Sequence, residues 1–418
     1  MKYCTRCLYP STKPRLTFNE EGVCSACQAY DRRAGIDWYA REAAWRQLII
    51  GSREHHKSPY DCVIPVSGGK DSTYQVATAL KWGLRPLAVT AMTDHLTEIG
   101  QRNLDNISKM GVDHVMVHVN QKLRRKINAY TLETVGDISW AEHALIFTVP
   151  LNEAALRDIP FILYGENPEN EYGGPPEAQQ SGLMSYGWLA EYGGLNGLRP
   201  SDLVDAGIAT KTEIYQYTRY MAIKVTAVFL GHYFPWDSFD NAQIAKVHGF
   251  KSMEPAACPG WNGDENLDNA SAQLSMAIRR GLITREAAVK LARKHDAFKS
   301  MEPAACPASW NGDENLDNAQ TGIHDRFMFL KYGYGRASAQ LSVAIRRGLI
   351  TRKDAVTLAR RCDNASPWPY CGASGAEILD AIGMSWGRYN AIERKFANPE
   401  LFAFDAVDGI PYPLFEVE

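Results

Sequence analysis

The chain of 418 residues contains no long apolar run: none approaches the roughly 20 consecutive apolar residues that a membrane-spanning helix needs. The first residues, Met1–Cys7, also lack the apolar core of a secretory signal peptide. These absences predict a cytoplasmic protein. In that compartment, the nine cysteines of the chain are expected to be metal ligands or free thiols rather than disulfides.

The sequence also has no excess of charge of either sign. It carries 45 Lys and Arg against 48 Asp and Glu, which gives a net charge of −3. Nucleic-acid-binding proteins usually present a basic surface, so this balance gives no electrostatic reason to expect a nucleic-acid partner. Apolar residues make up 45% and charged residues 22%, as in ordinary globular proteins, and the length suits roughly two to three domains.

Four of the cysteines form two Cys-x-x-Cys pairs near the N-terminus, separated by residues 8–23. Each pair places two sulfurs on one tight turn, and the intervening loop can fold the pairs around one tetrahedral Zn²⁺. Because protein would fill all four coordination positions, the expected role of the metal is structural. An iron–sulfur cluster, two disulfides or unrelated thiols are the alternatives. The expected ligands are Cys4, Cys7, Cys24 and Cys27.

A glycine-containing turn lies between an apolar run that ends at Val66 and a helical pattern that begins near Ser72. Such a turn favours anion binding, because glycines let the backbone approach a phosphate and the first N–H groups of the helix point at it. The spacing is neither that of a Walker A loop nor that of a dinucleotide-binding fingerprint. Ser-Gly-Gly-Lys-Asp-Ser at 67–72 instead resembles the PP-loop of ATP pyrophosphatases, and an ordinary glycine-rich turn is the alternative.

From Tyr60 onward, short apolar runs alternate with helical segments, which predicts an α/β fold with a doubly wound parallel sheet. Ligands bind such sheets beyond the carboxyl ends of the strands, so the residues that follow each strand are candidate site residues. A further helix is expected over Trp38–Ile50. The expected strands are Cys62–Val66, Pro86–Ala91, His114–Val119, Phe161–Tyr164 and Thr226–Leu230, and the helices between them are Ser72–Lys81, Glu98–Met110, Lys122–Glu133 and Glu142–Arg157.

Longer motifs follow the later strands. They are Gly165–Pro168 with Glu171–Gly174, then Trp188–Leu195, and then Tyr233–Asp237. With the cysteine pairs and the PP-loop, they make the chain resemble the N-acetyl sugar amidotransferases of surface-polysaccharide biosynthesis, which are related to the acetamidino-forming enzymes of pseudaminic acid and O-antigen synthesis. The resemblance runs from Cys4 to about Arg361. It implies a PP-loop, HUP-like fold with an N-terminal zinc knuckle and a mostly helical C-terminal lobe.

The resemblance also implies an activity, the ATP-dependent conversion of a sugar acetamido group to an acetamidino group. Transfer of AMP to the amide oxygen would give an imidate that ammonia can displace, with AMP and pyrophosphate as products. The expected cofactors are ATP, Mg²⁺ and structural Zn²⁺, and the expected substrate is an N-acetylated sugar linked to a nucleotide. No Cys-His-Glu arrangement typical of a glutaminase is found. Ammonia would therefore come from solution or, as the family implies, from a separate glutaminase subunit, with a cyclase-like companion.

Site residues follow from the loop, from the strand ends and from the family motifs. The catalytic candidates are Lys70, Asp71, Glu166 and Asn167. The nucleotide-binding candidates are Ser67, Gly68, Gly69, Lys70, Asp71, Ser72, Thr73 and Gly165. The substrate-binding candidates are Glu171, Tyr172, Tyr233, Asp237, Lys331, Tyr334 and Arg336. For Glu166, Asn167, Glu171 and Tyr172, satisfying local backbone groups is an equal alternative. For the Gly-Tyr-Gly-Arg turn at 333–336, a plain helix-to-helix turn is the alternative.

Two other functions stay open at this stage. A tRNA-modifying PP-loop enzyme, either a thiolase or a lysidine-type ligase, would share the loop and sometimes the cysteine pairs, but it should have a basic surface. A non-catalytic scaffold would keep the fold and bind ATP without turnover.

An internal repeat interrupts the family pattern. Residues 250–259 recur without change as 298–307, and 271–297 resemble 338–364, but 320–337 have no counterpart in the first copy. We interpret the first copy as a tolerated insertion and the second as the functional one, since two near-identical copies are too few for a solenoid. The predicted organisation is a zinc knuckle (1–35), a PP-loop domain (36–249), a duplicated helical insertion (250–297) and a helical substrate lobe (298–418).

Overall fold

The computed structural model describes residues 1–54, 57–173, 182, 194–218, 225–252, 315–406 and 409–417. Most of the first repeat copy, the start of the second copy, Gly174 and residues 188–193 of the family motifs lie outside the described residues. The domain boundaries predicted from the sequence stay predictions.

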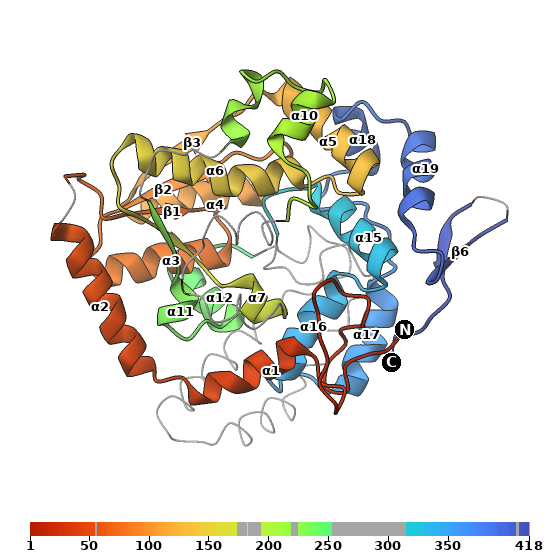
Figure 1. Cartoon of the computed structure of the whole chain (residues 1–418), viewed down its shortest axis with the longest axis horizontal. Helices are drawn as coiled ribbons and strands as arrows, with labels where there is room; N and C mark the ends of the chain where they lie inside the picture. Colours follow the sequence, from red (N-terminus) through yellow and green to blue (C-terminus); the bar gives the residue numbers. More distant parts are fainter. Residues whose placement is uncertain are drawn as a thin grey trace.

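A five-stranded sheet in the order β3-β2-β1-β4-β5 lies at the centre of the α/β domain (Figure 1). Every strand pair in this sheet is parallel, so the carboxyl ends of all five strands lie at one edge. Starting from β1, the chain adds β2 and β3 on one side of the sheet and then β4 and β5 on the other side. The strand order therefore reverses between β1 and β4. The strands are β1 (Cys62–Pro65), β2 (Pro86–Ala91), β3 (Asp113–Val117), β4 (Phe161–Tyr164) and β5 (Thr226–Phe229).

Helices cover both faces of this sheet. Alternate residues of β1 point to opposite faces: Val63 packs with one hydrophobic cluster, and Cys62 and Ile64 pack with another. The first cluster takes side chains from α5, α6 and η2, and the second takes them from α2, α3 and α4. A sheet buried on both faces confirms the predicted doubly wound fold. The elements are α2 (Trp38–Glu54), α3 (Lys70–Lys81), α4 (Glu98–Lys109), α5 (Gln121–Val135), α6 (Trp140–Leu156), α7 (Pro168–Tyr172), α10 (Pro200–Asp205), η2 (Glu213–Tyr217), α11 (Leu230–Tyr233) and α12 (Ser238–Val247).

The C-terminal region is mostly helical, as predicted. Its first helix joins it to the α/β domain, because Ile323 and Phe327 share a buried cluster with Leu132 of α5 and Ile138. Ser374 and Ser385 cap α18 and α19 through their side-chain oxygens, which accept hydrogen bonds from the first turn of each helix. The elements are α15 (Thr321–Tyr332), α16 (Arg336–Arg346), α17 (Arg352–Cys362), α18 (Gly375–Ala381), α19 (Trp386–Phe396), β6 (Phe402–Phe404) and β7 (Pro411–Pro413).

The N-terminal segment packs against this C-terminal lobe. It contains α1 (Ser25–Arg32) and η1 (Arg33–Gly35), and both chain termini lie beside α17 in Figure 1. Leu8 is fully buried with Leu341 and Ala355, and its backbone N–H donates to Oγ of Ser342 at 3.1 Å. The N-terminal, cysteine-bearing segment therefore packs against helices α16 and α17, which lie more than 300 residues later in the sequence.

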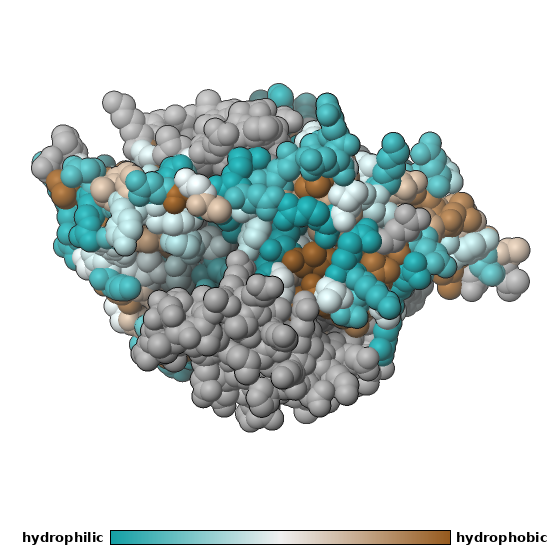
Figure 2. Space-filling model, turned by 90° about the horizontal axis from the view of Figure 1, so that it is seen from below, coloured by the Kyte–Doolittle hydropathy of each residue, from teal (hydrophilic) through white to brown (hydrophobic). Residues whose placement is uncertain are grey.

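No helix in the described part of the chain is long and apolar enough to cross a membrane. On the face drawn in Figure 2, hydrophilic colouring is spread widely, and part of the hydrophobic colouring gathers at the end that carries β6 and β7. The exposed apolar side chains of that end are Phe404, Ile410, Tyr412 and Leu414.

Candidate functional site

The predicted phosphate loop joins β1 to α3, as a PP-loop should. α3 begins at Lys70, two residues earlier than predicted, with Gly69 as its N-cap. No side chain caps this end, so the first N–H groups of the helix are available to an anion. The hydroxyls of Ser72 and Thr73 both donate to the Gly69 carbonyl at 3.0 Å, which holds the turn in shape.

Gly68 is needed because of both its backbone angle and the space around it. Its φ is +80°, in the left-handed region that glycine adopts at little cost. A Cβ at this position would lie 2.7 Å from the Leu104 nitrogen and 2.8 Å from the Asn103 carbonyl carbon. The loop is therefore pressed against the first turns of α4.

A small cavity of about 100 Å³ lies between the loop and the beginning of α4. The uncapped N-terminus of α3 faces this space, and its dipole favours a negative charge, while Gly100 and Asn103 of α4 line the other side. The cavity thus has the surroundings of a phosphate site. Its lining residues are Ser67, Gly68, Gly69, Lys70, Asp71, Ser72, Gly100, Asn103, Asn315, Leu316 and Asp317.

Lys70 and Asp71 are held side by side at this cavity. Lys70 is only 5% exposed, and its Nζ is paired with the Asp71 carboxylate. The Asn241 side chain of α12 donates to the other Asp71 oxygen at 3.0 Å. Asp71 thus keeps a fixed orientation toward both the phosphate cavity and the larger one beside it.

The larger cavity, of about 290 Å³, opens beyond the carboxyl ends of β1, β2 and β4. It shares Ser67, Asp71, Ser72 and Asp317 with the phosphate cavity, so one molecule can occupy both. Its walls are mainly apolar, as in most small-molecule sites. The lining residues include Val66, Gln75, Thr90, Thr93, Glu142, Ile146, Phe147, Tyr164, Gly165, Glu166, Pro168 and Phe229.

A segment of the C-terminal region forms one wall of both cavities. The backbone N–H of Thr97 donates to the Asp317 carbonyl at 3.2 Å, and the Ala319 N–H donates to the His95 carbonyl at 3.1 Å. Leu96 and Asn318 form an isolated antiparallel bridge. Residues 315–319 therefore lie against the loop after β2. This wall is missing from the sequence-based site, and so are Glu142 and Asp317.

Two carboxyl groups in the wall of the larger cavity, those of Glu142 and Asp317, have raised pKa values. Burial raises the pKa of Asp317 to about 7, and the nearby Glu142 adds to the shift. Burial also raises the pKa of Glu142, against the opposing effect of Arg124. Arg124 is 1% exposed and pairs with Glu142 and with Asp94, the latter at 3.0 Å. This part of the wall can therefore hold a proton near neutral pH.

The residues after β4 line or flank the same cavity. Gly165 and Glu166 form part of its wall, and Asn167 is 6% exposed at the start of α7. A Cβ on Gly165 would lie 2.8 Å from the Trp236 ring, so a larger residue there would displace that ring. The Gly231 N–H donates to the Gly165 carbonyl at 3.0 Å, which ties the ends of β4 and β5 together.

Glu171 and Tyr172, at the end of α7, face the N-terminal segment. Arg33 of η1 pairs with the Glu171 carboxylate, and Arg346 of α16 donates to the Glu171 carbonyl at 3.0 Å. A Cβ on Gly173 would lie 2.8 Å from Ala26 of α1. The helix that follows Glu166 and Asn167 is therefore clamped by the cysteine-bearing segment and by α16.

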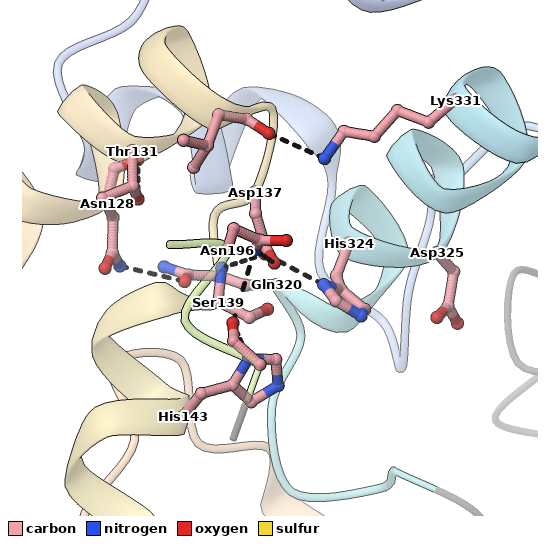
Figure 3. Close-up of polar contacts among 12 residues, drawn as sticks. Asn128, Thr131, Asp137, Ser139, His143, Asn196, Gln320, His324, Asp325 and Lys331 are labelled. Carbon is pink, nitrogen blue, oxygen red and sulfur yellow. Dashed lines mark hydrogen bonds and ion pairs between the residues drawn. The ribbon is translucent and has the colours of Figure 1, made fainter. Parts of the chain in front are cut away.

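The other predicted substrate-binding residues make contacts within the protein. Asp237 caps α12 and pairs with Arg347 at 2.7 Å, and the Tyr233 ring packs on Trp45. Lys331 donates to the Val135 carbonyl at 2.7 Å (Figure 3). Tyr334 is 6% exposed against Tyr9, and Arg336 pairs with Asp325 at 2.7 Å. Direct substrate contact by these five residues stays a prediction.

The predicted cysteine site is brought together. The four sulfurs of Cys4, Cys7, Cys24 and Cys27 lie within 4.8 Å of one another and are all buried. The Cys4–Cys27 and Cys7–Cys24 sulfur distances are 3.9 and 3.6 Å, close to the about 3.8 Å that a tetrahedral site with Zn–S bonds of about 2.3 Å requires. These four sulfurs can hold a metal ion. Cys62 has a free thiol, whereas Cys362 is disulfide-bonded, an exception to the expected absence of disulfides.

Comparison with protein families gives a match for the C-terminal region. Residues 308–413, about a quarter of the chain, match the C-terminal domain of WbpG-like LPS biosynthesis proteins. The chain is similar to the N-acetyl sugar amidotransferase-like PP-loop family. The match confirms the resemblance predicted from the motifs, and it falls on the second repeat copy.

The chain is also similar to solved structures, at low sequence identity. An NH3-dependent NAD synthetase from Campylobacter jejuni is 14% identical, with a TM-score of 0.28, and the match covers 52% of this chain and 99% of that one. An NMN synthetase from Francisella tularensis is 13% identical, with a TM-score of 0.25, covering 52% and 98%. No curated protein matches the chain.

Proposed function

We propose that the protein is an ATP-dependent amidotransferase that converts the acetamido group of a sugar to an acetamidino group in LPS or related surface-polysaccharide biosynthesis. The observation that carries the proposal is the joined pair of cavities. A phosphate-sized cavity between the N-terminus of α3 and the beginning of α4 opens into a larger, mainly apolar cavity, and both are walled by the region that matches the LPS biosynthesis family.

The chemistry requires a better leaving group than an amide oxygen. In the first step the oxygen of the acetamido group attacks the α-phosphorus of ATP, and pyrophosphate leaves. In the second step ammonia attacks the imidate carbon, the bond from that carbon to the AMP oxygen breaks, and one proton is released. The sum converts ATP, amide and ammonia into amidine, AMP and pyrophosphate.

The loop residues have distinct roles in this scheme. Backbone N–H groups of 67–72 would bind the β- and γ-phosphates, with Lys70 neutralising their charge. Asp71, fixed by Asn241, would bind the Mg²⁺ that ATP brings. Ser67, Ser72 and Thr73 shape the turn, and Gly165 lets the Gln75 and Trp236 side chains pack close to the strand end where the nucleotide would bind.

The sugar would lie in the larger cavity, next to Glu166. Glu166 and Asn167 would orient the acetamido group, and α7 would present Glu171 and Tyr172 on the side of the knuckle. Zn²⁺ would be held by the four cysteines and would keep α1 in contact with α7. Ammonia would come from solution or from a separate glutaminase subunit, and the enzyme would act in the cytoplasm.

Product analysis tests the proposal directly. Incubation with ATP, Mg²⁺, ammonium and N-acetylated sugar nucleotides should give AMP and pyrophosphate, with a sugar product one dalton lighter because oxygen is replaced by NH. Asp71→Asn should slow the reaction at least about 100-fold, because a lost electrostatic contact to the transferred group typically costs this much. Asp105→Asn, on the exposed side of α4, is the matched control and should react normally. Formation of ADP and phosphate would refute the proposal.

A further inference from the structure

Two histidines lie outside the residues so far assigned, where α6, which forms part of the wall of the larger cavity, meets α15 of the C-terminal lobe. His143 is on α6, three and four residues before Ile146 and Phe147, which line that cavity. Residues at these spacings lie on one face of a helix. His143 therefore lies on the cavity side of α6, next to Glu142, and its ring contacts that of the second histidine, His324 on α15.

His324 is held by a buried carboxylate. Its Nδ1 lies 2.9 Å from Oδ1 of Asp137, which is 5% exposed (Figure 3). The Asp137 carboxylate also accepts hydrogen bonds at 2.8 Å from the Ser139 backbone and from the Asn196 side chain. These three donors fix the carboxylate, so the Nδ1 of His324 carries a proton and the ring orientation of His324 is set.

His143 faces this pair but has a different environment. The two imidazole rings meet edge to face, with their centroids 5.5 Å apart, and Nδ1 of His143 lies 3.2 Å from the Gly194 carbonyl. That carbonyl can only accept, so Nδ1 of His143 carries the proton. Nε2 of the neutral ring is then left as a proton acceptor.

The charged groups around the two rings push their pKa values apart. Burial lowers the pKa of His143, and the neighbouring His324 and Arg336 lower it further, against the opposing effect of Asp137. Burial opposes the charge of His324 too, but Asp137 and Asp325 raise its pKa above the ordinary value despite Arg336. Burial acts to raise the pKa of Asp137, yet His324 and His143 hold it well below its usual range. These surroundings favour the charged form of His324 and the neutral form of His143.

We propose that His143 accepts the proton that ammonia loses in the second step of the proposed reaction, and that the Asp137–His324 pair acts as a positioning element for it. Ammonia attacks the imidate carbon, the carbon–oxygen bond to AMP breaks with its electrons going to AMP, and the proton on the new nitrogen passes to Nε2 of His143. His324, when protonated, favours the neutral, proton-accepting form of His143. The proposal rests on the proposed function.

The two steps can be measured separately. Exchange of labelled pyrophosphate into ATP, dependent on the sugar, reports the first step in the absence of ammonia. Formation of the amidine reports both steps. His143→Gln should leave the exchange rate within about threefold of wild type and should lower amidine formation about 100-fold, the lower end of the effect of a lost general base. His248→Gln, at an exposed position after α12, is the matched control and should change neither rate.

Two further measurements separate catalysis from a structural effect. In the wild type, amidine formation at constant NH₃ concentration should fall as the pH drops through the pKa of His143, and this dependence should be absent from His143→Gln. His143→Ala should regain amidine formation when imidazole is added. Asp137→Asn should move the pH dependence of amidine formation, since His324 would lose the carboxylate that keeps it charged.

The outcomes distinguish the two proposals. If the wild type shows no sugar-dependent exchange, the proposed function is wrong and this inference falls with it. If exchange occurs and His143→Gln forms the amidine at the wild-type rate, the inference alone is overturned. Equal loss of exchange and amidine formation in His143→Gln, without rescue by imidazole in His143→Ala, would also overturn it, because His143 would then act before the ammonia step.

Discussion

Replacing Gly68 by alanine tests whether the loop geometry is required for nucleotide binding. At φ +80° an alanine costs about 1–2 kcal/mol, because its Cβ approaches the following carbonyl oxygen. The same Cβ would lie 2.7 Å from the Leu104 nitrogen and 2.8 Å from the Asn103 carbonyl carbon. These atoms belong to the backbone of α4 and cannot rotate away, so relief requires the loop or α4 to move, at a further cost of about 1–3 kcal/mol.

Gly111→Ala is the matched control for this substitution. Gly111 follows α4, has φ +85°, and a Cβ there would meet no atom within 4 Å. It should therefore carry the backbone cost alone, and the difference between the two variants isolates the close approach of the loop to α4.

The two variants can be compared by urea denaturation and by ATP titration calorimetry. Gly68→Ala should lose about 1–3 kcal/mol more stability than Gly111→Ala. Its ATP affinity should fall at least about tenfold, the equivalent of about 1.4 kcal/mol, whereas that of Gly111→Ala should not change. Equal stability losses with unchanged ATP affinity in both variants would refute the argument that the loop needs its observed position against α4.

Three other predictions follow from the structure. Cys24→Ala should lower the bound zinc and raise the KM for the sugar, because α1 would no longer support α7, while ATP still binds; wild-type protein purified without chelators that contains no zinc would contradict this. Asp317→Asn should be more stable than the wild type at neutral pH. The pKa of Asp317 is about 7 in the folded protein, against an ordinary value of 3.8. The free energy of unfolding of the wild type should therefore fall relative to that of the variant as the pH rises from about 4 to 7, and the difference should stay constant above pH 7. A difference in urea unfolding that is constant from pH 4 to pH 8 would count against this prediction. Deletion of residues 250–297 should leave the melting temperature at least as high, because residues 298–300 then follow Gly249 and repeat Phe250–Ser252 exactly in sequence. Phe298 could replace Phe250, which is 2% exposed against Ala245 and Leu316, and failure of the deleted protein to fold would rule this out.

The sheet could be predicted from the sequence because its strands are buried on both faces. Strands such as Phe161–Tyr164 are continuous apolar runs bounded by turn residues, and the structure has the predicted bounds for this strand and for Pro86–Ala91. The other boundaries differ by at most two residues, except that α2 ends at Glu54, four residues beyond the predicted Ile50. α3, for example, starts at Lys70, with Gly69 as its N-cap. The first two residues of the helix, Lys70 and Asp71, are polar, so the apolar pattern of the sequence does not reveal them.

The candidate site could be predicted only where its residues follow a strand directly. The loop at 67–72 and Gly165–Glu166 meet that condition, and the structure places them in the joined cavities. Asp317 does not, because it reaches the site through backbone contacts with Thr97 and the loop after β2. A signal was available in the repeat, because residues 310–319, which contain Asp317, are identical to residues 261–270.

The histidine pair was missed for a related physical reason. His143 lies inside a mostly apolar helix, and His324 becomes significant only beside Asp137, which is nearly two hundred residues away in the sequence. A single histidine in either helix is compatible with ordinary packing. The difference in pKa between the two rings depends on a carboxylate, an arginine and burial that only the folded chain brings together.

The role of the cysteine-bearing segment also depends on contacts that form only in the folded chain. Its metal-binding spacing is local and readable, but its effect on the site depends on α1 meeting Gly173, where even a methyl group would not fit. Loss of metal should therefore be felt first at α7, on the sugar side of the cavity, and only weakly at the phosphate loop, which is supported by α4 and α12 instead.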